Sequence, residues 1–148
     1  MSTVGFTGTR SGMTPEQRRA VGALLAVLKP ERVVHGDCIG ADDDFDWLCS
    51  LRGIARGIRP CTAPDSLRAH CERNGATALA LPERPMMRNR HIVDDADVMI
   101  ACPPTRQRIK SGSGTWATIG FAERALRKLF VVYPDGEIDE RTGRAVRP

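Results

Sequence analysis

Three glycine-containing loops hold most of the residues whose types and spacing could do chemistry. They read GTRSGMT (8–14), GDCIGAD (36–42) and PPTRQRIKSGSGT (103–115). Glycine lets the backbone approach a ligand closely, and the free N–H groups at a helix start attract anions. The third loop is the strongest candidate, because glycines and hydroxyls gather there directly before a predicted helix. Its predicted phosphate-binding residues are Gly112, Ser113, Gly114 and Thr115.

The first loop adds Gly8, Thr9 and Arg10, the last of which carries one fixed positive charge. The alternative for these two loops is structural, namely a strand-to-helix turn without a ligand and a basic surface loop that ends in a helix cap. The chain has no G-x-x-x-x-G-K-[ST] run, so a P-loop triphosphatase is not supported. It also lacks a complete G-x-G-x-x-G after the first strand, so the usual NAD fingerprint is absent.

The second loop ends in a run of carboxylates, Asp42, Asp43 and Asp44. Adjacent carboxylates diverge on a helix, so we interpret Asp42 as a helix cap and its neighbours as favourable charges in the first turn. We therefore expect no metal there and no resident cofactor. Asp37, beside Gly36, lies within the loop, where its carboxylate could accept from ribose hydroxyls. Asp37 is thus a predicted ligand contact and, if the protein is an enzyme, the candidate catalytic residue.

Alternating strands and helices must position these loops. The hydrophobic pattern predicts strands at 3–7, 32–35, 54–59, 97–102 and 129–133, and helices at 15–28, 41–52, 86–95 and 114–128. Within residues 60–85 it predicts a short helix that ends at Gly75, and it leaves 76–81 open as helix or strand. This order favours an α/β fold, a Rossmann-like three-layer α/β/α sandwich with a mainly parallel sheet of about five strands. Right-handed crossovers would place the three loops at the carboxyl edge of that sheet.

Composition narrows the class of protein. The chain of 148 residues is 41% hydrophobic and 27% charged, which favours one globular domain over 1–135 followed by a tail at 136–148. That tail could form a hairpin around Thr142-Gly143 or be disordered. Five widely spaced cysteines without a C-x-x-C pair indicate free thiols, and the N-terminus reads as a strand and not as a signal peptide. With no apolar stretch as long as a membrane span, these features predict a cytoplasmic protein without membrane contact.

The net charge of +4 suits an anionic small ligand at least as well as nucleic acid, because the arginines do not form one long block. Aromatic residues make up only 5% of the chain. A platform for single-stranded nucleic acid needs several exposed rings on a basic groove, and this sequence offers Trp116 and little else. We therefore rank a nucleic-acid partner well below a small molecule.

Four segments, in this order, resemble the SLOG superfamily: GFTGTR, VVHGDCIGAD, MMRNRHIVDDADVMIACPP and GSGTWATIGFAE. The superfamily contains the DprA/Smf proteins, the LOG nucleotide phosphoribohydrolases and the small YpsA/YspA-like proteins. The chain is most similar to the stand-alone YspA-like branch, over about residues 4–133. The resemblance implies a Rossmann-like fold, a nucleotide or nucleotide-derived ligand, and a homo-oligomer.

The resemblance also implies roles for individual residues. Gly112, Gly114 and Thr115 match the phosphate-binding turn of the LOG motif PGG-x-GT-x-x-E, and Arg88 and Asn89 match the Arg-Asn pair that begins the facing helix. The glutamate of that motif, however, is replaced by Thr118, and Glu123 lies more than a turn further along. The leading hypothesis is therefore a sensor or metabolite-binding protein that binds its nucleotide-derived ligand at the carboxyl edge of the sheet. The alternatives are a LOG-like N-glycosidic hydrolase and DprA-like binding of single-stranded DNA.

Overall fold

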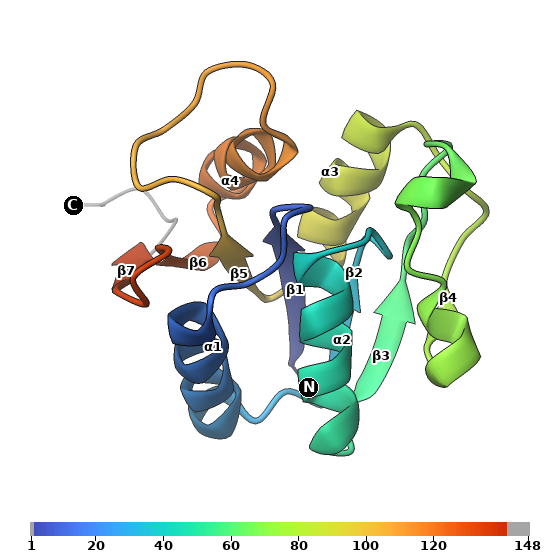
Figure 1. The fold of residues 1–148 in the computed structure, drawn as a ribbon, viewed down its shortest axis with the longest axis horizontal. Coiled ribbons are helices and arrows are strands. Elements are labelled where there is room, and N and C mark those ends of the chain that lie inside the picture. The colour runs from blue at the N-terminus through green and yellow to red at the C-terminus, as the bar shows by residue number, and fades with distance from the viewer. Residues whose placement is uncertain (1, 142–148) are drawn as a thin grey trace.

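The computed structural model describes residues 2–141, which form one mixed sheet covered by helices on both faces (Figure 1). Seven strands follow the order β4-β3-β2-β1-β5-β6-β7. They are β1 (Thr3–Gly8), β2 (Arg32–His35), β3 (Ala55–Ile58), β4 (Thr77–Ala78), β5 (Val98–Cys102), β6 (Lys128–Val132) and β7 (Ile138–Arg141). All neighbours pair in parallel except β6 and β7, which are antiparallel. The mainly parallel sheet is confirmed, but the expected number of about five strands was too low.

Both additional strands lie at the edges of the sheet. β4 contains two exposed residues, and β7 alternates between exposed and half-buried positions, so neither carries an apolar pattern. β7 lies within the segment predicted as a tail and returns to β6 through a turn in which Gly136 has a φ of +88°. The hairpin turn expected at Thr142-Gly143 lies outside the described residues.

Helices form the two outer layers. α1 (Pro15–Leu28) and α2 (Ala41–Leu51) cover one face of the sheet, and α3 (Pro85–Asp95) and α4 (Gly114–Arg124) cover the other (Figure 1). In the first core, the rings of Phe6 in β1 and Phe45 in α2 stack with their centroids 4.2 Å apart. In the second core, Ile92 of α3 and Ile119 of α4 are buried. The three-layer α/β/α sandwich predicted from the sequence is therefore confirmed.

The local chemistry of the chain explains where the helices start and stop. Thr14 caps α1 with Pro15 at its first position, and the side chains of Thr14 and Gln17 form a capping box. α4 ends at Arg124, four residues earlier than predicted (124 against 128), because Leu126 adopts a left-handed conformation with φ 58°. Residues 60–85 form two single-turn 3₁₀ helices, η1 (Asp65–Leu67) and η2 (Cys71–Asn74), and Gly75 ends the second at φ +100°.

The strand order reverses between β1 and β5. From β1 the chain builds outward through β2, β3 and β4, then returns to place β5 on the other side of β1. Open α/β sheets bind ligands at such a reversal, outside the carboxyl ends of the strands. Among the described residues, none of the helices is both long and apolar enough to span a bilayer.

Candidate functional site

A cavity of about 370 Å³ opens at this reversal of strand order. Its volume lies within the range of small-molecule pockets. Segments from all three glycine-containing loops and the start of α3 line it. Every predicted site residue except Asp37 contributes to the lining: Gly8, Thr9, Arg10, Gly36, Arg88, Asn89, Gly112, Ser113, Gly114 and Thr115.

The N-terminus of α4 forms one wall of the pocket. Ser113 is the N-cap, and its Oγ accepts from the backbone N–H of Trp116 at 3.2 Å. In the described part of the chain, no protein group accepts from the N–H groups of Gly114 and Thr115. A Cβ added at Gly114 would meet nothing within 4 Å, so the space before the helix is open. Free N–H groups and the positive end of the helix dipole make this wall favourable for an anion.

The loop after β1 forms the adjoining wall and is held against the start of α2. The carbonyl oxygen of Thr9 accepts from the N–H of Gly12 at 3.1 Å and from that of Ala41 at 2.9 Å. Gly40, at φ +89°, lies so close to the Arg10 backbone that a Cβ there would overlap it. The side chain of Arg10 is exposed and has no hydrogen bond or ion pair with any described residue. The glycine thus allows two loops to meet, and this contact presents a free cation at the mouth of the pocket.

Arg88 and Asn89 form the floor of the pocket. Arg88 is 5% exposed, and its Nη1 donates to the carbonyl oxygens of Gly36 at 2.6 Å and Arg59 at 3.1 Å. Its Nε donates to Asn89 Oδ1 at 2.7 Å, and its Nη2 lies 3.6 Å from Cys38 Sγ. A guanidinium has five N–H groups, so about one remains for a ligand. Arg88 therefore mainly fixes the loop after β2.

Asp37 does not line the pocket, contrary to its predicted place at the ligand. Its side chain is fully buried, and its Oδ2 accepts from Arg68 Nη2 at 2.7 Å while its Oδ1 accepts from the N–H of Cys71 at 2.8 Å. Its backbone has φ +57°. Arg68 comes from residues 60–85, where the sequence pattern is weakest, so the sequence did not reveal this partner.

Asp42 takes the place in the pocket that was expected of Asp37. The prediction that it caps α2 is wrong, because the N-cap is Gly40 and no side chain caps this helix. The Oδ2 of Asp42 instead reaches back along the loop and accepts from the N–H groups of Gly36 at 3.2 Å and Cys38 at 3.1 Å. Burial raises the pKa of this carboxyl, while the charges of His35 and Arg88 oppose the rise.

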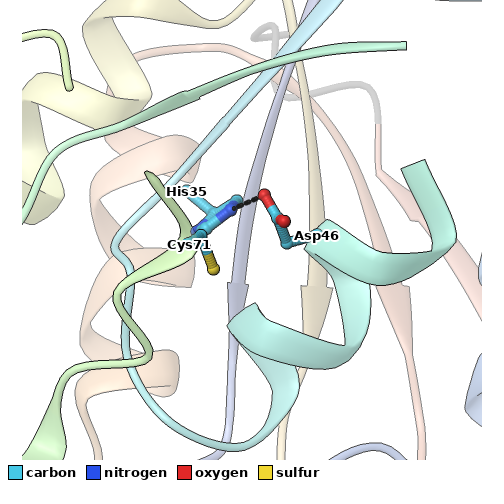
Figure 2. Close-up of side chains that lie close together, drawn as sticks. All are labelled: His35, Asp46 and Cys71. Atoms are coloured by element: carbon cyan, nitrogen blue, oxygen red, sulfur yellow. Dashed lines mark hydrogen bonds and ion pairs between the residues drawn. The ribbon is translucent and has the colours of Figure 1, made fainter. Parts of the chain in front are cut away.

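A second polar cluster contains the buried residues His35, Asp46 and Cys71 (Figure 2). His35 Nε2 lies 2.8 Å from Asp46 Oδ1, and Arg56 donates to both oxygens of Asp46 at 3.2 Å. The ligand atoms of His35, Asp46 and Cys71 lie within 4.8 Å of one another, which is close enough to consider a metal. The N–H of Asp37, however, donates to His35 Nδ1 at 3.0 Å, so neutral His35 carries its proton on Nε2 and directs it at Asp46. This pattern favours an internal hydrogen-bond network over a metal site.

Residues considered for other roles are occupied within the protein. Thr118, at the position of the LOG glutamate, is buried and donates to the carbonyl oxygen of Gly114 at 2.8 Å. Glu123 pairs with Arg108 at 2.8 Å and with Arg141 at 2.6 Å, and it does not line the pocket. Trp116 is 3% exposed, so it packs over the sheet edge and offers no stacking surface.

Searches for relatives found similarity in structure and none in sequence. No protein-family model and no curated protein matches the chain. A molybdenum cofactor binding protein from the phototrophic bacterium Rippkaea orientalis superposes with a TM-score of 0.67 at 16% identity, covering 89% of this chain and 76% of that one. DNA processing protein A (DprA) from Streptococcus pneumoniae gives 0.65 at 17% identity and covers 88% of this chain, which spans only half (50%) of DprA.

A third structure, the structural-genomics protein TM1055, gives a TM-score of 0.60 at 17% identity and covers 87% of this chain and 72% of that one. All three neighbours belong to the superfamily that the loop motifs resemble. Identities of 16–17% establish a shared fold and leave the ligand open. The chain therefore shares its Rossmann-like fold with these three structures.

Proposed function

We propose that the protein binds a nucleotide or nucleotide-derived small molecule in the pocket at the carboxyl edge of the sheet, as a sensor or metabolite-binding protein. The observation that carries this proposal is the wall of unpaired donors formed by Gly114 and Thr115 beside the free cation of Arg10. A phosphate group supplies the acceptors and the negative charge that such a wall attracts.

The remaining lining suits the less charged part of a nucleotide. Ile92, Pro104 and Ile109 contribute apolar surface to the same pocket. Ile109, in the loop between β5 and α4, is 37% exposed, so this loop contributes an apolar side chain to the pocket lining. A base or sugar ring buried there would lose water from apolar surface while the phosphate stayed at the helix start.

Simple binding fits the site better than N-glycosidic hydrolysis. Cleavage passes through a positively charged sugar and needs a carboxylate beside the anomeric carbon. Thr118 cannot supply that charge, and the carboxylate of Asp37 is already bound by Arg68 and Cys71. Asp42 does line the pocket, but burial raises its pKa and so disfavours the charged form that this step needs. We therefore expect weak hydrolysis or none, which is tested by incubating the protein with nucleotides and measuring released base by chromatography.

Nucleic-acid binding is the second candidate, because one structural neighbour is a DNA processing protein. The pocket lining is unfavourable for it, since the aromatic ring that lines the pocket, Phe6, is fully buried and so is Trp116 nearby. A platform for single strands uses several exposed rings. We also retain the prediction of a homo-oligomer, which light scattering after size exclusion would test.

The direct test is a thermal-shift screen of nucleoside monophosphates, cyclic nucleotides and ADP-ribose derivatives, with a single-stranded oligonucleotide as a separate arm. A ligand present at about 100 times its Kd should stabilise the protein by about 2.7 kcal/mol. Arg10→Ala should abolish most of the shift, whereas Arg19→Ala, an exposed arginine on α1 that does not line the pocket, should not. A panel without any shift, or a shift that Arg10→Ala leaves intact, would contradict the proposal.

A further inference from the structure

Asp42 is the one carboxylate in the described lining of the pocket. The residue is 5% exposed, so nearly all of its surface is buried. Both hydrogen bonds that it accepts, from Gly36 and Cys38, end on Oδ2. A buried side chain placed in this way presents its second oxygen to the cavity without a protein partner.

The second oxygen, Oδ1, is available to a ligand. No described group donates to it, and it forms no ion pair with Arg88. Among the described residues, Oδ1 is not one of the fully buried side-chain atoms that lack a hydrogen-bond partner. Because it has no partner, it must keep some contact with the pocket. An oxygen that is open to the pocket and has no protein partner can accept a hydrogen bond from a ligand.

The pocket therefore has two chemically different parts. The wall at Gly114 and Thr115 offers N–H donors, while Asp42 offers an oxygen acceptor. A phosphate placed against an ionised Asp42 would be repelled, because two anions would share a poorly solvated space. A hydroxyl suits this oxygen in either state, since it donates to the carboxylate and accepts from the acid.

Building on the proposed function, we infer that Oδ1 of Asp42 binds a sugar hydroxyl of the ligand and makes the site selective for nucleotides with a free 2′- or 3′-hydroxyl. The phosphate lies at the start of α4, and the 2′- or 3′-hydroxyl of the sugar donates to Asp42. The substrate class is thus a nucleoside 5′-phosphate or a derivative with a free 2′- or 3′-hydroxyl on its sugar. In this inference, Asp42 makes the ligand contact that the sequence predicted for Asp37.

The test compares the ribonucleoside 5′-monophosphates AMP, GMP, CMP and UMP with their 2′,3′-dideoxy counterparts by isothermal titration. Removing both hydroxyls leaves the carboxylate unpaired, so the dideoxy forms should bind at least about 10-fold more weakly. In Asp42→Asn the amide NH2 takes the place of Oδ1 and can only donate to the hydroxyl. A neutral hydrogen bond then replaces a charge-assisted one, so the gap should shrink to less than about 3-fold. The amide keeps an oxygen for the N–H groups of Gly36 and Cys38, so this variant retains the loop. Asp43→Asn, the exposed neighbour on α2, is the matched control and should keep the full gap.

The outcomes separate this inference from the proposed function. If ribo- and dideoxynucleotides bind equally well, selection by Asp42 is wrong and nucleotide binding stands. A gap that persists in Asp42→Asn places the hydroxyl contact on another residue and also overturns the inference. If no mononucleotide binds, the proposed function fails and the inference with it. Circular dichroism of each variant confirms that the fold is intact.

Discussion

The pocket and the buried cluster around His35 both contain residues from α2 and from β2 or the loop that follows it. The polar groups of the two regions differ, however, in whether they have partners within the protein. In the cluster, buried Asp46 is bound at 2.8–3.2 Å by buried His35 and by half-buried Arg56. In the pocket, the N–H groups of Gly114 and Thr115 and one oxygen of Asp42 have no described protein partner. Closed polar networks add to stability and specificity, whereas open donors and acceptors are available to a ligand.

Two aspartates of one loop illustrate the difference. Asp37 turns into the cluster, because the guanidinium of Arg68 and the N–H of Cys71 meet it there. Asp42, five positions later, turns back toward its own loop and into the pocket. Residue type alone therefore does not separate structure from function here. The number of partners that each carboxylate has within the protein does.

The largest effect is expected for Asp46→Ala. It removes the shared partner of buried His35 and Arg56, and breaking a buried ion pair costs about 3–5 kcal/mol. Urea denaturation measures the loss, with Asp43→Ala as an exposed control on the same helix. Nucleotide affinity should be unchanged under conditions where the variant is folded. A loss no greater than that of Asp43→Ala would show that the cluster does not stabilise the fold.

A smaller loss is expected for Gly40→Ala, which tests the contact between the first two loops. The residue has φ +89° and abuts the Arg10 backbone, so a Cβ adds both strain and a clash, at about 2–4 kcal/mol. Gly53→Ala is the matched control, since Gly53 also has a positive φ, +69°, but has nothing within 4 Å. It should cost about 1 kcal/mol. Equal losses in the two variants would mean that the loop contact contributes nothing.

The pH dependence of stability should have opposite signs for the two carboxylates. Burial raises the pKa of Asp42, so its native state holds a proton more tightly, and its contribution to stability falls as pH rises through that folded value. Burial also opposes ionisation of Asp46, but hydrogen bonds from His35 and Arg56 outweigh it and lower the pKa. The stabilisation from Asp46 is therefore present above the unfolded pKa of about 3.9 and is lost in more acidic solution.

Chemical denaturation between about pH 3 and pH 8 checks both signs. In Asp42→Asn the fall in stability toward neutral pH should disappear. The free energy of unfolding of this variant should therefore rise relative to that of the wild type as the pH rises. The free energy of unfolding of Asp46→Asn should fall relative to that of the wild type as the pH rises. Profiles with the same slope for both variants would contradict the assignment of one open and one closed carboxylate.

The smallest effect on stability is expected for Arg10→Ala, because its exposed side chain has no described partner. The midpoint of thermal unfolding should stay within about 1 °C of wild type in the absence of ligand. The stabilisation by nucleotide should nevertheless be lost, unlike in Arg19→Ala. If unfolding without ligand shifts by several degrees, Arg10 belongs to the structure and not to the pocket.

The sequence predicted the parallel core well, because β5 and most of β6 are apolar runs, β1 and β2 carry shorter ones, and α1 has a complete capping box. It left the segment of β4 open as helix or strand and gave β7 only as part of a possible tail hairpin, because their exposed edge positions carry no apolar pattern. Within the site, the glycine loops were recognisable from backbone requirements. The exchange of roles between Asp37 and Asp42 was not, since it depends on Arg68, a partner that is distant in sequence and in a segment without regular structure.

The most direct measurement is a two-dimensional NMR titration of the backbone amides with AMP, GMP, CMP and UMP in turn. At least one nucleotide should shift the amides of 9–11 and 112–115, with saturation at a single Kd. The amides of His35, Asp46 and Cys71, in the closed cluster, should move far less. Titrations in which neither loop shifts, or in which the cluster shifts more than the loops, would contradict the account of the pocket as the nucleotide site.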